Sequence, residues 1–399
     1  MFFDLKKIDP KRIDHFLFFA AVLVVGLIIM THIFRYTAGP SRTELILAGQ
    51  CEDLFGKETV DALIQEFEER NPELRIRLAT NDPGAKNRSG PDIIIFDEDE
   101  FNGLSLSSLN SYIHTESGAE QQAIPLVSFM DLLFYNIELL QAAGFDRPPK
   151  TRAEFLACAK AVSAAHAADG NSTDSGIYGA ALGLSPKDPQ ALRRDVFSWI
   201  WAAGGELRQE DAFGGKTVSD VLAFLGQLKS EGALAPGSFE KTGADRLEEF
   251  ARGKIALMIT SARVIPALQK EMGGNFGITV IPGSAGPVSP EKNILGLSGI
   301  YAGISADSAH PDEAWGFLIF LAEKSPALSA KLKAVPGSLP GPFSASNAGA
   351  AVVDYKTDDP LYSKARDIFE ASDIAQGFAG QSLSEEFERI ARKELNVLF

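Results

Sequence analysis

The chain has 399 residues, 45% of them hydrophobic and 23% charged, which is typical of a globular protein long enough for two domains. Its formal net charge of −15 excludes the basic surface that nucleic-acid binding requires and disfavours attachment to anionic lipid headgroups. The two cysteines, Cys51 and Cys158, allow at most one disulfide, and they are interpreted as ordinary buried thiols.

The first predicted element is an uncharged apolar segment at residues 16–34. As a helix with a rise of about 1.5 Å per residue, it would be roughly 28 Å long, close to the thickness of the hydrocarbon core of a bilayer. Lys6, Lys7, Lys11 and Arg12 precede it, so the N-terminus should stay in the cytoplasm and the rest of the chain should be exported. The apolar core of a signal peptide is shorter, about 7–15 residues, so the sequence favours an uncleaved anchor over a cleaved signal.

Cys51 does not have the position of a lipid-carrying cysteine. Such a cysteine directly follows a small residue behind the apolar core, whereas Gln50 separates Cys51 from Gly49, and the apolar core ends well upstream at Phe34. The apolar run that precedes Cys51 is therefore interpreted as the first strand of a folded domain.

From residue 43 onward, predicted strands and helices alternate. Apolar runs at residues 45–48 and 92–96 predict buried strands, and alternation at residues 74–78 predicts a half-buried one. Residues 57–70 have apolar side chains at helical spacing and predict an amphipathic helix. This order is typical of a parallel α/β sheet.

The rest of the chain continues this alternation. Helices are predicted at about residues 151–166, 193–203, 220–229, 245–252, 311–323 and 384–398, and strands at 255–259, 276–281 and 300–304. Thr151 and Glu154 predict a capping box at the start of the first of these helices.

Motifs of known enzyme classes are missing from the sequence. The five histidines have no metal-ligand spacing, and there is no C-x-x-C, no G-x-G-x-x-G and no Walker-type loop. GLSG at residues 296–299 is one residue short of a nucleophile elbow and is interpreted as a glycine-rich turn. No enzymatic activity, cofactor or metal is expected.

Residues 123–155, AIPLVSFMDLLFYNIELLQAAGFDRPPKTRAEF, resemble a signature of the bacterial extracellular solute-binding proteins of ABC importers. The resemblance is strongest to the sugar-binding, maltose-binding-protein-like group. Further segments resemble this family in the same order: GPDIIIFD at 90–97, GKIALMI at 253–259, NFGITVIPG at 275–283 and HPDEAWGFLIFLA at 310–322. Because the order and spacing agree, the resemblance extends over about residues 43–340.

The resemblance implies an α/β, two-lobed periplasmic-binding-protein-like fold of type II, preceded here by one N-terminal transmembrane helix. By analogy, the chain divides into a cytoplasmic stub and anchor at 1–36, a linker at 37–42, lobe I at 43–127 and 285–325, and lobe II at 128–284 and 326–399. Ligand sites in open sheets lie where loops leave the carboxyl ends of strands, which independently favours the loops between the lobes.

Candidate binding residues are the members of these loops whose side chains suit a carbohydrate. Carboxylate and amide groups hydrogen-bond with sugar hydroxyls, and aromatic rings pack on the apolar faces of a pyranose. The candidates are Gln50, Glu52, Asp53, Asp97, Asp99, Phe129, Asp131, Trp201, Arg263 and Tyr301. Trp199 and Trp201 lie two residues apart on one predicted helix, so at most one of them should face the cleft.

Arg263 departs from the family pattern. Sugar-binding relatives often have a tryptophan near this position, whereas an arginine can bind a carboxylate, a phosphate or an anionic sugar through bidentate hydrogen bonds. It could equally lie on a helix surface. The solute-binding role is therefore better supported than the sugar assignment.

The sequence predicts a monomeric, membrane-tethered extracytoplasmic protein that captures a small solute, a carbohydrate in the first instance, and delivers it to the permease subunits of an ABC transporter. Two alternatives stay open. One is a sensory or anion-binding protein of the same fold, and the other is a tethered surface glycoside hydrolase that uses the acidic loops.

Overall fold

The structure is a computed structural model that describes residues 42–49, 51–79, 90–97, 104–112, 122–166, 176–205, 215–283, 293–325, 328, 338–340 and 359–374. The predicted membrane segment at 16–34 and the predicted helix at 384–398 lie outside these ranges. Among the described residues, no helix is both long enough and apolar enough to cross a membrane.

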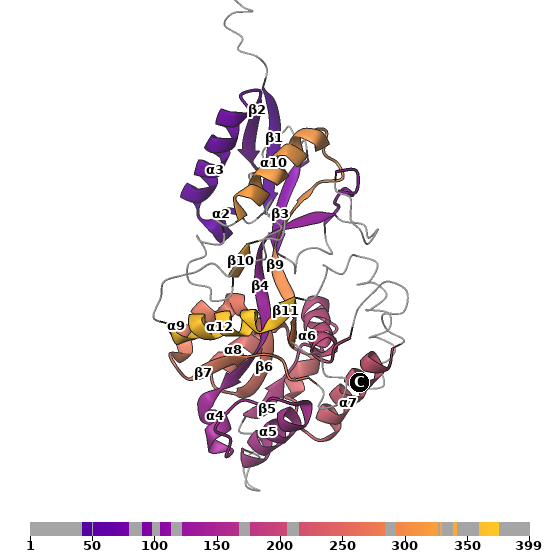
Figure 1. The fold of residues 1–399 in the computed structure, drawn as a ribbon, viewed down its shortest axis with the longest axis vertical. Helices are drawn as coiled ribbons and strands as arrows, with labels where there is room; N and C mark the ends of the chain where they lie inside the picture. Colours follow the sequence, from indigo (N-terminus) through magenta and orange to yellow (C-terminus); the bar gives the residue numbers. More distant parts are fainter. Residues whose placement is uncertain are drawn as a thin grey trace, which may run out of the picture.

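Two groups of elements are joined by long strands (Figure 1). The group that we call the upper lobe consists of β1 (Thr43–Gly49), α2 (Cys51–Phe55), α3 (Lys57–Arg70), β2 (Leu74–Leu78), β3 (Ile93–Asp97) and α10 (Pro311–Glu323). The strands that join it to the rest are β4 (Ala123–Asn136), β9 (Leu297–Ile304) and β10 (Ser338–Pro340).

The remaining elements form the group that we call the lower lobe (Figure 1). Its strands are β5 (Tyr178–Ala181), β6 (Ile255–Ser261), β7 (Phe276–Thr279), β8 (Asn293–Leu295) and β11 (Ser372–Ile374). Its helices are α4 (Ile137–Ala142), α5 (Arg152–Ala165), α6 (Pro189–Ala202), α7 (Lys216–Ser230), α8 (Gly243–Ala251), α9 (Ile265–Met272) and α12 (Pro360–Glu370), with short 3-10 turns η3 (Pro236–Phe239) and η4 (Ala262–Val264).

One sheet runs through both lobes, with the strand order β2-β1-β3-β9-β4-β6-β5. β1 is parallel to β2 and to β3, as a strand–helix–strand order requires. β9 is antiparallel to both β3 and β4, and β4 is antiparallel to β6. The prediction of a parallel sheet therefore holds for β1–β3 and is wrong for the joining strands, because β9 returns to the upper lobe from a distant part of the chain.

Each lobe has an aromatic core beside this sheet. In the upper lobe, the rings of Phe67 on α3 and Phe317 on α10 meet edge to face, with centroids 4.8 Å apart. In the lower lobe, Trp199 on α6 lies 5.1 Å from both Phe155 and Phe224. Burial of each such ring contributes about 1.5–3 kcal/mol to folding. Buried side chains of β4 connect the upper-lobe core with part of the lower lobe in one continuous cluster.

Several helix boundaries follow from identifiable caps. α10 has the predicted bounds. α6 begins four residues earlier than predicted, because the Asp188 carboxylate accepts a hydrogen bond from Ala191 N at 3.0 Å and proline fits the first turn. The predicted capping box at α5 forms only in part: Thr151 Oγ1 accepts from Glu154 N at 3.2 Å, whereas the Glu154 carboxylate accepts from Lys150 N.

Two predicted loops are regular elements instead. The segment after β1 is not a loop, because α2 begins at Cys51 and places the Cys51 side chain in the core. GLSG at 296–299 is not a turn: Gly296 separates β8 from β9, and the next three residues belong to β9. Ser298 of this segment therefore lies on β9, one of the strands that join the lobes.

Candidate functional site

Three adjacent strands bring one carboxylate and two hydroxyl groups together where the lobes meet. Asp131 on β4 stands opposite Ser261 on β6. Ser298 at the start of β9 donates to Asp131 Oδ1 at 3.0 Å, and its oxygen lies 2.7 Å from Ser261 Oγ. Asp131 is only 2% exposed, and a carboxylate so deeply buried requires such partners.

An ion pair joins the two lobes beside these groups. Asp97 is the last residue of β3 in the upper lobe, and Arg263 lies in η4 directly after β6 in the lower lobe. Arg263 Nη1 contacts Asp97 Oδ2, and the two side chains remain 39% and 22% exposed, respectively. Burial lowers the pKa of the Arg263 guanidinium, which nonetheless stays protonated at any ordinary pH. The backbone N–H of Arg263 points to Ser261 Oγ at 3.4 Å, which connects the pair to the hydroxyl groups.

An aromatic ring completes the arrangement. Trp201, near the end of α6, is half-buried and packs edge to face on Phe197 at 5.6 Å. A Cβ atom at Gly296 would lie 2.6 Å from the Trp201 ring and 3.1 Å from Asp131 Oδ2, so only glycine lets the ring and the carboxylate approach each other here. We call Asp97, Asp131, Trp201, Ser261, Arg263 and Ser298 the interlobe cluster.

The cluster includes four of the residues that the sequence singled out: Asp97, Asp131, Trp201 and Arg263. Of the two tryptophans, at most one of which was predicted to face the cleft, Trp199 is fully buried in the lower-lobe core and Trp201 is half-buried.

Other predicted residues lie elsewhere. Phe129 is 1% exposed and belongs to the core, and Tyr301 is 6% exposed and stacks on Phe96 with ring centroids 6.0 Å apart. Both rings are interior groups in this arrangement, because their strands turn these positions towards the packed faces of the sheet. Glu52 and Asp53 are exposed on α2, where Glu52 pairs with Lys57 at 3.2 Å.

Gln50 and Asp99 lie outside the described residues. The sequence reasoning missed two members of the cluster, Ser261 and Ser298. Ser298 stands in the GLSG segment and Ser261 lies two residues before Arg263, but a serine on a strand that joins the lobes has no sequence motif of its own. Only the pairing of β4 with β6 and β9 identifies them.

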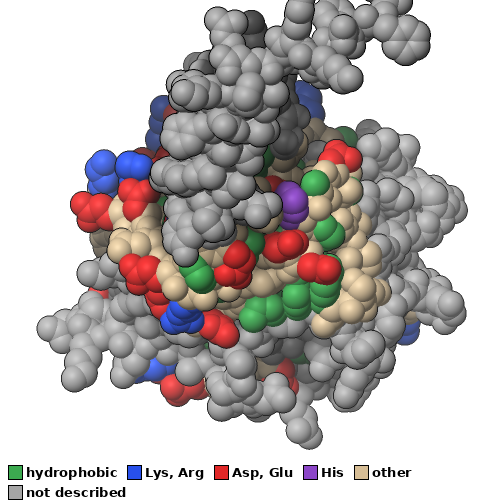
Figure 2. Space-filling model, turned by 90° about the horizontal axis from the view of Figure 1, so that it is seen from above, with side chains coloured by type: hydrophobic (Ala, Val, Ile, Leu, Met, Phe, Trp, Pro, Cys, Tyr) green, Lys and Arg blue, Asp and Glu red, His purple; other side chains and the backbone are tan. Residues whose placement is uncertain are grey.

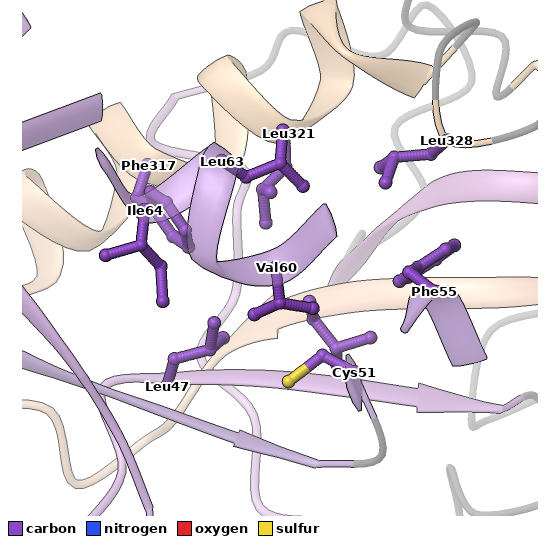
Figure 3. A pocket seen from close by; sticks show the side chains of 10 residues that line it. Leu47, Cys51, Phe55, Val60, Leu63, Ile64, Phe317, Leu321 and Leu328 are labelled. Carbon is purple, nitrogen blue, oxygen red and sulfur yellow. The ribbon is translucent and has the colours of Figure 1, made fainter. Parts of the chain in front are cut away.

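A hollow in the upper lobe has a different character (Figure 3). It lies between α3, α10 and the sheet, and only apolar side chains line it: Leu47, Cys51, Phe55, Val60, Leu63, Ile64, Ile95, Phe317, Leu321 and Leu328. Burial raises the pKa of the Cys51 thiol, so this sulfur stays protonated and behaves as an apolar group. Without polar groups, the hollow does not suit a carbohydrate.

The charged groups of the upper face agree with the acidic composition. Figure 2 shows Asp and Glu side chains spread over the described part of this face, with few Lys and Arg side chains among them. Within the described residues, no three His, Cys, Asp or Glu side chains come close enough to hold a metal ion.

Comparison with known proteins now identifies the family. The profile of the bacterial extracellular solute-binding proteins matches residues 91–358. The chain belongs to this family. The resemblance carried by residues 123–155 is thereby confirmed at the level of the family.

Curated relatives of this solute-binding protein include proteins of Brucella abortus (strain 2308) and Brucella suis biovar 1 (strain 1330) whose names describe them as binding proteins. Each is 26% identical over 234 residues, which cover 57% of this chain and 52% of the relative. The chain thus matches about half the length of these relatives.

Solved structures share the fold at low sequence identity. The cyclic α-maltosyl-1,6-maltose binding protein of Arthrobacter globiformis has a TM-score of 0.60 at 18% identity, covering 88% of this chain and 94% of that one. An ABC substrate-binding protein of Listeria monocytogenes in complex with cycloalternan has a TM-score of 0.57 at 15% identity, covering 89% and 94%. UgpB of Mycobacterium tuberculosis in complex with glycerophosphocholine has a TM-score of 0.56 at 17% identity, covering 90% and 99%. These likenesses establish the α/β periplasmic-binding-protein-like fold.

Proposed function

We propose that this solute-binding protein captures a carbohydrate between its lobes at the interlobe cluster and delivers it to the permease of an ABC transporter. The observation that carries the proposal is the composition of the cluster. Carboxylates, hydroxyls and a guanidinium stand beside an indole ring, and the two lobes contribute Asp97 and Arg263 from opposite sides.

The chemistry of the cluster supports this solute class. A sugar hydroxyl both donates and accepts hydrogen bonds, so it can use the partly exposed Asp97 as acceptor and Arg263 as donor. The buried Asp131 holds Ser298 in place beside them. The ring of Trp201 offers an apolar face of the size of a pyranose. Binding at micromolar affinity requires only about −8 kcal/mol, which a few such contacts supply after ordering costs.

The mechanism is capture by lobe closure, with no bond made or broken. A solute that contacts both lobes binds the closed arrangement more tightly than the open one and therefore shifts the population towards closure. Two of the three structural neighbours described above are binding proteins for maltose-type or cyclic saccharides by name or bound ligand, which agrees with this assignment.

The apolar segment at residues 16–34 supports a place for the protein at the membrane. In this proposal it anchors the chain, with the folded part on the extracytoplasmic side and next to the permease. N-terminal sequencing of the exported protein tests the anchor, because a mature chain that starts beyond Phe34 would show that the segment is cleaved.

A thermal-shift screen tests the solute class. A ligand that binds the folded state alone raises the melting temperature as its concentration increases. The added free energy of unfolding is about 2.7 kcal/mol at 100 times the dissociation constant. We expect this response from a mono- or oligosaccharide and not from amino acids or polyamines. Asp131→Asn and Trp201→Ala should abolish it.

The matched controls are Asp61→Asn and Trp315→Ala. Asp61 is an exposed carboxylate on α3, and Trp315 stacks on Tyr112 in the upper lobe with centroids 4.9 Å apart, away from the cluster. Both variants should keep the sugar response. Turnover of a chromogenic glycoside that is lost in Asp97→Asn, together with no response to any saccharide, would instead support a hydrolase.

A further inference from the structure

The ion pair between the lobes leaves hydrogen-bonding capacity unused. A guanidinium has five N–H donors and a carboxylate has about four acceptor positions. Among the described residues, Asp97 is the side-chain partner of the Arg263 guanidinium, and Arg263 is the side-chain partner of the Asp97 carboxylate. Since both side chains keep part of their surface exposed, spare donors and spare acceptors lie next to each other at the lobe boundary.

Charge decides which solutes can use this surface. A sugar hydroxyl can accept from Arg263 and donate to Asp97 at the same time, so it adds to the pair without breaking it. A carboxylate can only accept, and a phosphate keeps an O–H donor at neutral pH but carries net negative charge. Either anion must therefore compete with Asp97 for the guanidinium and approach the negative charges of Asp97 and Asp131, which a partly desolvated site screens poorly.

We propose that Asp97 is a specificity-determining residue: by neutralising Arg263 across the lobe boundary, it restricts the site to uncharged polyhydroxylated solutes and excludes anions. The solute class in this statement rests on the proposed function, whereas the exclusion of anions rests on the ion pair alone. Arg263, which departs from the family pattern, then provides N–H donors for solute hydroxyls without creating an anion site.

The proposal predicts that removing one charge creates an anion site. Asp97→Asn keeps the size of the side chain but leaves the guanidinium without its counter-charge. The freed guanidinium is planar and suited to bidentate contact with phosphate. The variant should therefore acquire affinity for a simple anion that the parent protein lacks.

The experiment uses inorganic phosphate as the probe, at constant ionic strength adjusted with sodium chloride. Isothermal titration calorimetry and thermal shift are measured for the parent protein, Asp97→Asn, the double variant Asp97→Asn/Arg263→Gln, and Asp61→Asn as matched control. We expect Asp97→Asn to bind phosphate at least tenfold more tightly than the parent protein. In their response to phosphate, the double variant and the control should not differ from the parent protein.

Two results would overturn the proposal. One is phosphate binding by the parent protein as tight as that of Asp97→Asn, and the other is no gain in a folded Asp97→Asn protein. Circular dichroism and the melting temperature establish that the variant is folded. If it does not fold, Arg263→Gln replaces it: the proposal then requires that the parent protein and Arg263→Gln are equally unresponsive to phosphate.

A second arm separates this proposal from the proposed function. Each neutral sugar of the screen is paired with its acid, such as galactose with galacturonate. The parent protein should bind the neutral member alone, and Asp97→Asn should bind the acid at least tenfold more tightly than the parent protein does. If the parent protein binds no sugar while Asp97→Asn gains phosphate binding, the carbohydrate assignment fails and the role of Asp97 stands.

Discussion

Two aspartate–arginine groups of this protein differ in what surrounds them. Inside the lower lobe, Asp195 is fully buried, accepts from Gly183 N at 2.5 Å and lies 3.4 Å from Arg194 Nε. Arg246, 1% exposed, stands nearby and donates to Lys241 O at 3.2 Å. The interlobe pair of Asp97 and Arg263 is partly exposed and belongs to two lobes.

The difference separates charges that hold one lobe together from charges that remain partly exposed between the lobes. Within one lobe, the neighbours of Asp195 stay in place, so its charge is compensated permanently. Burial raises the pKa of Asp195, and the nearby Arg194 and Arg246 lower it, so the carboxyl group depends on these two cations to be ionised. Between lobes, the compensation of Asp97 would change with the proposed lobe closure.

The largest expected effect comes from replacing the buried arginine. Arg246→Met keeps about the same volume but removes a positive charge that compensates the buried Asp195, and leaving a buried charge undercompensated costs up to about 3–5 kcal/mol. Arg263→Met, at a partly exposed pair, should cost less than about 1 kcal/mol. Urea unfolding at pH 7 measures both, and equal losses would contradict the distinction.

The destabilisation caused by Arg246→Met should depend on pH. Loss of Arg246 raises the folded-state pKa of Asp195 further above its unfolded value of 3.8. The protonated Asp195 therefore stabilises the folded state at low pH. This stabilisation is present in full below pH 3.8 and is lost as pH rises through the folded-state pKa. The destabilisation by Arg246→Met should therefore be smaller at pH 4.5 than at pH 7.5. Unfolding curves at these two values provide the measurement.

The two tryptophans of α6 extend the comparison to apolar groups. Trp199→Ala should lower the free energy of unfolding by about 3–4 kcal/mol, because it empties a site between Phe155 and Phe224 and removes the ring under Arg152. Trp201→Ala should cost about 1 kcal/mol, since the ring is only half-buried. Its main effect should be on sugar binding, measured by calorimetry. A large loss of stability in Trp201→Ala with unchanged binding would assign that ring to the core.

Much of this organisation could be predicted from the sequence, because it depends on local patterns. Apolar spacing and Pro311 gave the bounds of α10, and alternation gave β2. The directions of the joining strands could not be predicted, since nothing local in β9 says that it pairs with β3 and β4. Single-strand patterns are the same in parallel and antiparallel sheets when both faces are buried.

The site divides in the same way. Asp97 and Arg263 were recognisable as polar residues that follow buried strands, but their pairing depends on how two lobes come together. Ser261 and Ser298 became site residues only through the register of β4 with its neighbours. Phe129 and Tyr301 were chosen for their rings, and the pleat of their strands placed both in the interior.

A smaller effect is expected from salt, and we expect it to change the separation of the lobes through the interlobe pair. Added salt shortens the screening length from about 30 Å at 0.01 M to about 3 Å at 1 M, which weakens an exposed pair far more than a buried one. The radius of gyration from small-angle X-ray scattering should rise with salt in the parent protein. In Arg263→Met, the radius of gyration at low salt should be higher than that of the parent protein and should not change as salt is added. A salt response that persists in this variant would assign the change to other charges.

The smallest effect concerns Glu154, an exposed carboxylate paired within one lobe. Hydrogen bonds from Arg147 and from the Lys150 backbone lower the pKa of Glu154 from 4.5 to about 2. A lowered folded-state pKa means that the contribution to stability is present above 4.5 and is lost as pH falls towards 2.

In Glu154→Gln, the urea midpoint should therefore differ from that of the parent protein by a constant amount above pH 5, and the difference should shrink below pH 4. Arg147→Gln is the matched control, because it removes the guanidinium that donates to Glu154 and should reproduce part of the loss. Both side chains are exposed, so the effect should stay well below that of Arg246→Met, although both pairs lie within the lower lobe. Burial would then distinguish the charges around Asp195, which stabilise the fold, from the exposed Arg147–Glu154 pair, which contributes little. The Asp97–Arg263 pair would differ from both because it lies between the lobes. An effect of Glu154→Gln as large as that of Arg246→Met would break this division.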